Sequence, residues 1–242
     1  MTALKLKRGQ VIVFEGDSLT GRRGGPSLDN WPFLRLMNWH HSWADEFAHL
    51  LFSWRPELRL TFHNAAVGGS TCRGVMGRLE RMVLPHKPDW VLMTLGGNDS
   101  RVGIPKAEFR NTLVEYARRL REVNRGCRLV FVGGFRAGPH YPREKAARMP
   151  ARHQYYALLR QVARTTRGAY IDAGSGLHRL ATELHRQHPI HTVYSDGGHL
   201  NAVGNLIVAG EVLKAFATFS KECDRLIQDL LQQRDHVPTD EG

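Results

Sequence analysis

The stretch VIVFEGDSLT, residues 11–20, decides the fold of this chain. Its first four residues are all apolar, and three of them are Val or Ile, which is typical of a strand buried on both faces of a sheet. Small and polar residues follow at once, at 16–20, where the strand is expected to end. The stretch therefore predicts a buried parallel strand with polar side chains at its carboxyl end.

Four more short runs and three helical patterns extend this prediction along the chain. The runs at 58–62, 90–95, 129–132 and 169–171 predict strands, and apolar residues recur at helical spacing over 109–123, 151–166 and 202–216. Gly126 is the predicted stop of the first of these helices. Alternating strands and helices predict a parallel sheet with helices on both faces, whose ligands bind at the carboxyl ends of the strands.

Three further glycine-rich polar loops are predicted at or near that edge. They are residues 64–71 after the second run, 96–100 after the third, and 196–201 before the last helix. Together with residues 15–20, they supply the groups that acyl transfer needs. Ser18 is a candidate nucleophile, His199 can take its proton because its ordinary pKa is near neutral, and Asp196 can orient the imidazole.

The same loops contain donors for the oxyanion of a tetrahedral intermediate. The backbone N–H groups of Ser18 and Gly69 and the side-chain amide of Asn98 could converge on one point. Ser70, with Cys72 nearby, is a rival nucleophile that lacks a partner at diagnostic spacing. Asp17 and Asp99 are expected to orient loops by hydrogen bonds, and Asp17-Ser18 alone could be a helix N-cap.

These four loops together resemble the sequence blocks of the SGNH (GDSL) hydrolase superfamily, in the order of that family. The resemblance implies an α/β fold of the flavodoxin-like three-layer type, with five parallel strands in the central sheet. It implies a Ser18, Asp196 and His199 triad, an oxyanion hole of Ser18, Gly69 and Asn98, and an acyl-enzyme. No cofactor and no metal are needed. We expect a serine esterase that acts on a short acyl group, such as an acetyl ester of a carbohydrate.

Substrate-binding candidates follow from two further patterns. Trp31 lies in a tryptophan-rich segment, 21–43, which either packs in the core or at an oligomer interface, or forms a platform for a sugar ring. Arg73 and Arg136, with Arg101, follow strand-end loops and are either solvated charges or the border of a pocket for an anionic substrate. A metal site is not expected at the three evenly spaced histidines His185, His188 and His191.

Three alternatives to a short-chain esterase stay open. An acyltransferase would use the same triad with an alcohol as acceptor. A lipid esterase or thioesterase would differ in acyl length. A protein that binds polyanions without catalysis would need only the fold and the basic charge.

Composition limits the remaining classes. The 242 residues carry a net charge of +11, which we attribute to solubility because no nucleic-acid-binding motif accompanies it. The three cysteines suggest no disulfide framework. No signal peptide or transmembrane segment is recognised, so we expect a cytoplasmic protein, compatible with a homo-oligomer. The predicted organisation is one domain over 1–220 and a partly helical tail over 221–242.

Overall fold

A computed structural model describes residues 4–21, 42–136, 151–187, 193–195 and 198–216, together with Arg225 and Asp229. Several predicted positions lie outside these residues. They are Trp31, Asp196, His188, His191 and Cys223, and nearly all of the tail predicted for 221–242.

The described residues contain a central sheet of five parallel strands in the order β2-β1-β3-β4-β5. The strands are β1 (Val11–Gly16), β2 (Thr61–Asn64), β3 (Trp90–Thr94), β4 (Arg128–Val132) and β5 (Ala169–Ile171). All neighbouring pairs are parallel. The strand order reverses direction at β1, which pairs with β2 on one side and β3 on the other. In such sheets ligands bind beyond the carboxyl ends at this point, so the predicted loops begin in the expected place.

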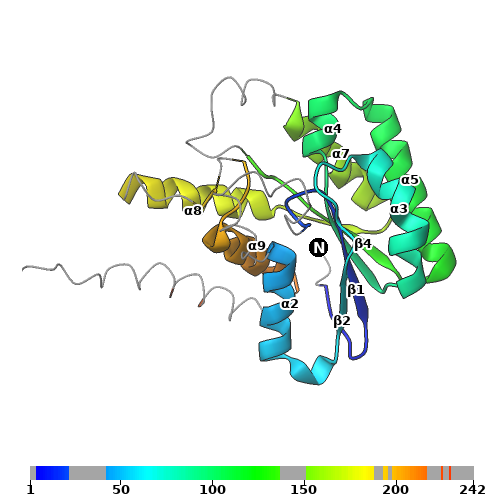
Figure 1. Ribbon diagram of the computed structural model, residues 1–242, viewed down its shortest axis with the longest axis horizontal. Coiled ribbons are helices and arrows are strands. Elements are labelled where there is room, and N and C mark those ends of the chain that lie inside the picture. Colours follow the sequence, from blue (N-terminus) through cyan, green and yellow to red (C-terminus); the bar gives the residue numbers. More distant parts are fainter. Residues whose placement is uncertain are drawn as a thin grey trace, which may run out of the picture.

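Helices cover both faces of the sheet, as predicted (Figure 1). One group packs together on one face: α2 (Trp43–Trp54), α8 (Ala173–Gln187) and α9 (Ala202–Lys214). The other face carries α3 (Cys72–Met82), α4 (Gly97–Val102), α5 (Lys106–Val123) and α7 (Arg152–Thr165). The predicted helices correspond to α5, α7 and α9, whereas α3, α4 and α8 were not predicted, and α4 begins within the loop predicted at 96–100. The three-layer α/β fold is therefore confirmed.

The core on one face of the sheet is built around the aromatic ring of Phe14 in β1. This ring makes edge-to-face contacts with Trp43 and Phe47 of α2, at centroid distances of 5.6 and 5.8 Å. Trp43 is fully buried, and its indole N–H donates a hydrogen bond to Thr20 Oγ1 over 3.2 Å. At Trp43, therefore, the core interpretation of the tryptophan-rich segment holds.

Two predicted boundaries are wrong. The second strand was expected at 58–62, but β2 covers Thr61–Asn64. Pro56 begins a short 3₁₀ helix, Pro56–Leu58, and Arg59 then adopts a left-handed conformation with φ of 46°, so the chain becomes extended only afterwards. The helix expected to stop at Gly126 ends earlier, because Asn124 is already extended with φ of −141°.

No helix in the described ranges combines the length and the apolar character needed to cross a bilayer.

Candidate active site

Ser18 and His199 meet at the carboxyl end of β1. Ser18 directly follows this strand, and His199 lies on the loop that leads into α9. Ser18 Oγ is 2.9 Å from His199 Nε2, although the two residues are 181 positions apart in the chain. Both side chains are partly exposed. A hydroxyl and an imidazole at this distance can exchange a proton and remain accessible to a ligand.

The turn that presents Ser18 depends on its neighbours Gly16 and Asp17. Gly16 has φ of 129°, and a Cβ at this position would lie 2.1 Å from the carbonyl oxygen of Thr94 in β3. Only glycine lets the chain pass so close to that strand. Buried Asp17 accepts hydrogen bonds at Oδ1 from Leu19 N (3.0 Å) and Thr94 Oγ1 (3.2 Å). Burial raises the pKa of Asp17. Its predicted role as a loop-orienting residue is therefore confirmed.

The glycine loop after β2 lies against the Ser18 side chain. A Cβ built on Gly68 would lie 3.6 Å from Ser18 Cβ, whereas one built on Gly69, which has φ of 78°, would meet nothing within 4 Å. The backbone N–H groups of Ser18 and Gly69 donate no hydrogen bond to any described residue. Two backbone donors thus remain available on the loops beside the hydroxyl.

Asn98 joins the third loop to the second. It lies in the first turn of α4, and its side-chain amide donates a hydrogen bond to the Ser70 carbonyl over 3.2 Å. The next residue, Asp99, is fully buried and accepts hydrogen bonds from Cys72 N (2.7 Å) and Gly96 N (3.2 Å). Burial raises the pKa of Asp99. Asp99 therefore holds the start of α3 and the start of α4 together.

A buried ion pair, which the sequence did not predict, lies behind these loops. Glu15, at the end of β1, has no exposed surface, and Arg78 Nε of α3 donates to its Oε1 over 3.0 Å. The same guanidinium donates to Ser70 Oγ and to the Gly16 carbonyl, both over 2.8 Å. Burial raises the pKa of Glu15, and Arg78 opposes this shift. The pair ties the glycine loop to the Ser18 turn.

Only one of these two residues left a signal in the sequence. Glu15 is an acidic residue at the end of an apolar run, and it must be paired if that run is buried. Arg78 is one of several arginines in a helical segment, 63 positions away, and nothing local distinguishes it.

The side chains of Ser70, the rival nucleophile, and of the nearby Cys72 are not suited to act as nucleophiles. Ser70 Oγ donates to the Val67 carbonyl over 2.6 Å and accepts from Arg78, so its hydroxyl serves the loop. The thiol of Cys72 is buried, and burial together with Asp99 raises its pKa to about 12. A thiol with this pKa remains protonated at neutral pH, so it is a poor nucleophile.

Arg73 and Arg136, two further predicted site residues, interact with residues other than Ser18 and His199. Arg73 forms a two-pronged ion pair with Glu108 of α5, with Nη2 2.8 Å from Oε2, and is largely exposed. Arg136 is exposed, and its carbonyl accepts a 3.4 Å hydrogen bond from Tyr194. The expected roles of Arg73 and Arg136 in substrate binding stay predictions, as do those of Asp196 and Trp31, which lie outside the described residues.

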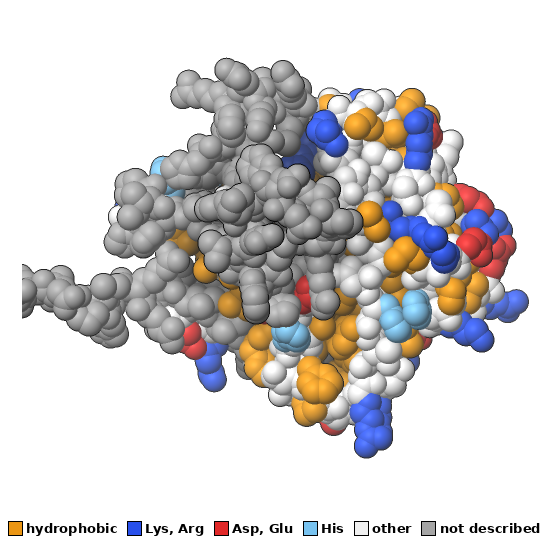
Figure 2. All heavy atoms as spheres, viewed as in Figure 1, with side chains coloured by type: hydrophobic (Ala, Val, Ile, Leu, Met, Phe, Trp, Pro, Cys, Tyr) orange, Lys and Arg blue, Asp and Glu red, His pale blue; other side chains and the backbone are white. Residues whose placement is uncertain are grey.

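The described part of the chain also holds no group of three His, Cys, Asp or Glu side chains that could bind a metal ion. His185, the one described member of the histidine series, lies in α8. Among the coloured residues of the face shown in Figure 2, the Lys and Arg side chains are scattered and do not form one continuous patch.

Comparison with known proteins adds a family to this geometry. Residues 14–207 match the model of the GDSL-like lipase/acylhydrolase family. An acetylxylan esterase of Geobacillus stearothermophilus is 24% identical over 216 residues, which are 87% of this chain and 95% of that protein. Thioesterase 1/protease 1/lysophospholipase L1 of Escherichia coli is 33% identical over 114 residues, 47% of each chain.

Solved structures show the same fold. The acetylxylan esterase of Geobacillus stearothermophilus superimposes with a TM-score of 0.69 at 20% identity, over 88% of this chain and 96% of that one. An alpha/beta hydrolase enzyme from the metagenome of Lake Arreo in Spain gives a TM-score of 0.68 at 23% identity, over 87% and 96% of the two chains.

Proposed function

The chain belongs to the GDSL-like lipase/acylhydrolase family and is a carboxylic ester hydrolase, and we propose that Ser18 is its nucleophile, His199 its general base and Asp196 the carboxylate that orients His199. The observation that carries this proposal is the 2.9 Å distance between Ser18 Oγ and His199 Nε2. Asp196 precedes His199 by three residues, which is close enough for a carboxylate on the same loop to reach the ring.

The proposed reaction proceeds through an acyl-enzyme. Ser18 Oγ attacks the ester carbonyl while its proton passes to His199 Nε2. The tetrahedral intermediate collapses, the carbonyl–alkoxide bond breaks, and the imidazolium gives its proton to the departing alcohol. Water, deprotonated by His199, then attacks the acyl group. The second intermediate releases the carboxylic acid and restores the Ser18 hydroxyl.

The oxyanion of each intermediate requires hydrogen-bond donors. We assign this role to the backbone N–H groups of Ser18 and Gly69 and to the Asn98 side chain. The two backbone groups have no acceptor among the described residues. Asn98 donates to the neighbouring Ser70 carbonyl, so a bound oxyanion has to compete for its N–H or use the second one.

We infer further that the substrate carries a short acyl group, such as an acetyl ester of a carbohydrate. The relative named acetylxylan esterase matches along 95% of its own length, whereas the thioesterase and lysophospholipase relative matches along 47%. Structures of catalytic mutants of that esterase carry alanine in place of a serine, an aspartate or a histidine, the residue types proposed for this site.

Hydrolysis of p-nitrophenyl acetate and p-nitrophenyl decanoate tests both the Ser18 site and the preference for a short acyl group. We expect the wild type to prefer the acetate by about tenfold or more, since pocket size discriminates strongly between acyl chains. Ser18→Ala is expected to be inactive, and Ser53→Ala, at an exposed position in α2, should behave as the wild type. An active Ser18→Ala enzyme would refute the site.

Three other outcomes would change the proposed function. Preference for the decanoate would favour a lipid esterase or thioesterase. Acetyl transfer to an added sugar in place of acetate release, detected by product analysis, would identify an acyltransferase with the same triad. An inactive wild type with salt-sensitive affinity for polyanions would favour a binding protein.

A further inference from the structure

A pocket lies at the opposite end of the sheet from Ser18. It has a volume of about 610 Å³ and is lined by Lys5, Lys7, Gln10, Asp89, Trp90, Gly126 and Arg128. Gln10 and Asp89 directly precede β1 and β3, and Arg128 is the first residue of β4. The strands are parallel, so their amino ends share one edge of the sheet, whereas Ser18 and Asn98 follow the carboxyl ends. The pocket is therefore distinct from the proposed active site.

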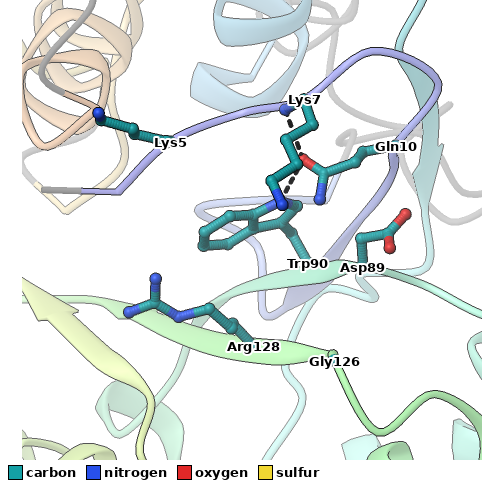
Figure 3. Close-up of a pocket in the computed structure, with 7 residues that line it drawn as sticks. All are labelled: Lys5, Lys7, Gln10, Asp89, Trp90, Gly126 and Arg128. Carbon is teal, nitrogen blue, oxygen red and sulfur yellow. Dashed lines mark hydrogen bonds between the residues drawn. The ribbon is translucent and has the colours of Figure 1, made fainter.

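Cationic groups surround the pocket on several sides. Lys7 and Arg128 come from different segments and lie on opposite sides of the Trp90 indole (Figure 3). The Arg128 guanidinium lies over the indole, 5.1 Å from the centroid of the ring, in a cation–π contact. Lys5 lies on the same segment as Lys7. None of these three side chains forms an ion pair with a carboxylate in the described part of the chain.

The acceptors that line the pocket are already used by the protein. Gln10 Oε1 accepts hydrogen bonds from Lys7 N (2.8 Å) and from the Trp90 indole N–H (2.9 Å). Asp89 is the one acidic residue of the lining, and its two oxygens accept from Val11 N (2.8 Å) and from Asn124 Nδ2 (3.3 Å). The pocket lining therefore offers more hydrogen-bond donors than free acceptors, and more positive than negative charge.

From this excess of cationic donors over free acceptors, we propose that the pocket is a second, non-catalytic site that binds a phosphate group. The lining carries three cations against the single carboxylate of Asp89, and a multivalent oxyanion balances this excess of positive charge while it accepts hydrogen bonds from the cations. Arginine and lysine are the side chains that bind phosphate by charge-assisted hydrogen bonds. The volume of about 610 Å³ is within the range of small-molecule sites and leaves room for an organic group beside the phosphate.

The test is isothermal titration calorimetry of the full chain with inorganic phosphate and with phenyl phosphate. Ionic strength is held at about 0.1 M, where the Debye length is about 10 Å, so that distant surface charges contribute little. We expect saturable binding at one site, weakened about tenfold or more by Arg128→Gln and by Lys7→Ala. Tighter binding of phenyl phosphate than of inorganic phosphate would identify a phosphorylated organic molecule as the ligand, and equal affinities would identify the free ion.

Matched variants separate this site from general attraction to a basic protein. Arg110→Gln and Lys106→Ala each remove one positive charge from an exposed position in α5, and we expect both to bind phosphate as the wild type does. Lys7→Ala leaves the Arg128–Trp90 contact in place, so it tests the site even if Arg128→Gln lowers stability. The proposal is overturned if the wild type shows no saturable binding, or if all four variants lose the same affinity. All four variants should retain esterase activity.

Discussion

The carboxyl and amino ends of the sheet differ in how their charged side chains are paired. At the carboxyl end, Glu15 and Arg78 are buried and bonded to each other, and two buried aspartates accept backbone N–H groups. At the amino end, Lys5, Lys7 and Arg128 face a pocket without a carboxylate partner in the described ranges. Buried charges must be fully paired, which fixes the loops that carry them, whereas unpaired charges at the surface remain available to a ligand.

The largest expected effect concerns the proton acceptor at the carboxyl end. His199→Ala should lower kcat for p-nitrophenyl acetate by a factor on the order of 10⁴ or more, because Ser18 loses its base. His153→Ala, at an exposed position in α7, is the matched control. Circular dichroism should show both variants folded. A folded His199→Ala enzyme with more than about a tenth of wild-type activity would contradict the assignment.

Breaking the buried ion pair should reduce stability strongly. Arg78→Met leaves the Glu15 carboxylate buried without its partner, and we expect the free energy of unfolding to fall by about 3–5 kcal/mol. Urea denaturation measures this change. The double variant Glu15→Gln with Arg78→Met removes the unpaired charge and should recover part of the loss. If the double variant is no more stable than Arg78→Met, the pair does not act as described.

Two glycines with the same backbone conformation give a matched test of the two ends. Gly69, on the loop whose Gly68 lies against Ser18, has φ of 78°, Gly9 before β1 has φ of 77°, and a Cβ would meet nothing within 4 Å at either position. Alanine should cost about 1–2 kcal/mol of stability at both, because both require a left-handed conformation. Only Gly69→Ala should also lower kcat/KM, since strain in this backbone would shift the Gly69 N–H that we assign to the oxyanion hole. Equal activity of the two variants would argue against Gly69 as part of the site.

The smallest expected effect is a pH dependence of stability that arises from His63 in the edge strand β2. The rings of His63 and His86 are stacked with centroids 3.6 Å apart, and burial, followed by the neighbouring His86, lowers the pKa of His63 from 6.5. The unfolded chain then binds the proton more tightly, so stability is complete above about pH 6.5 and falls as the pH drops below it. His63→Gln should flatten urea midpoints measured between about pH 7 and pH 5. His153→Gln should leave the slope unchanged.

Sequence predicted the sheet well where burial is complete. Runs such as 129–132 are apolar because helices cover both faces of the strand, and this pattern is readable without a structure. The boundary error fell on β2, an edge strand whose residues are exposed or half-buried, so that its apolar signal is weak. The local conformation of Arg59 that delays this strand has no distinct sequence signal.

The sequence predicted the residues of the candidate site only where the proposed chemistry requires particular residue types. Ser18 and His199 come from loops whose residue types are those that acyl transfer would require, and the structure brings the two side chains into contact. The pairing of Arg73 with Glu108, 35 positions away, and of Arg78 with Glu15 depends on how α3 packs, which no local pattern encodes. The sequence therefore predicted the two side chains that the structure brings into contact, and it missed the buried charges that hold their loops in place.

Covalent labelling tests the central claim most directly. The enzyme is treated with a p-nitrophenyl alkylphosphonate, which forms a stable adduct with an activated serine, and the modified peptide is located by mass spectrometry. The account predicts a single adduct on Ser18 in the wild type and none in His199→Ala. An adduct on Ser70, or an enzyme that hydrolyses p-nitrophenyl acetate while Ser18 stays unmodified, would contradict it.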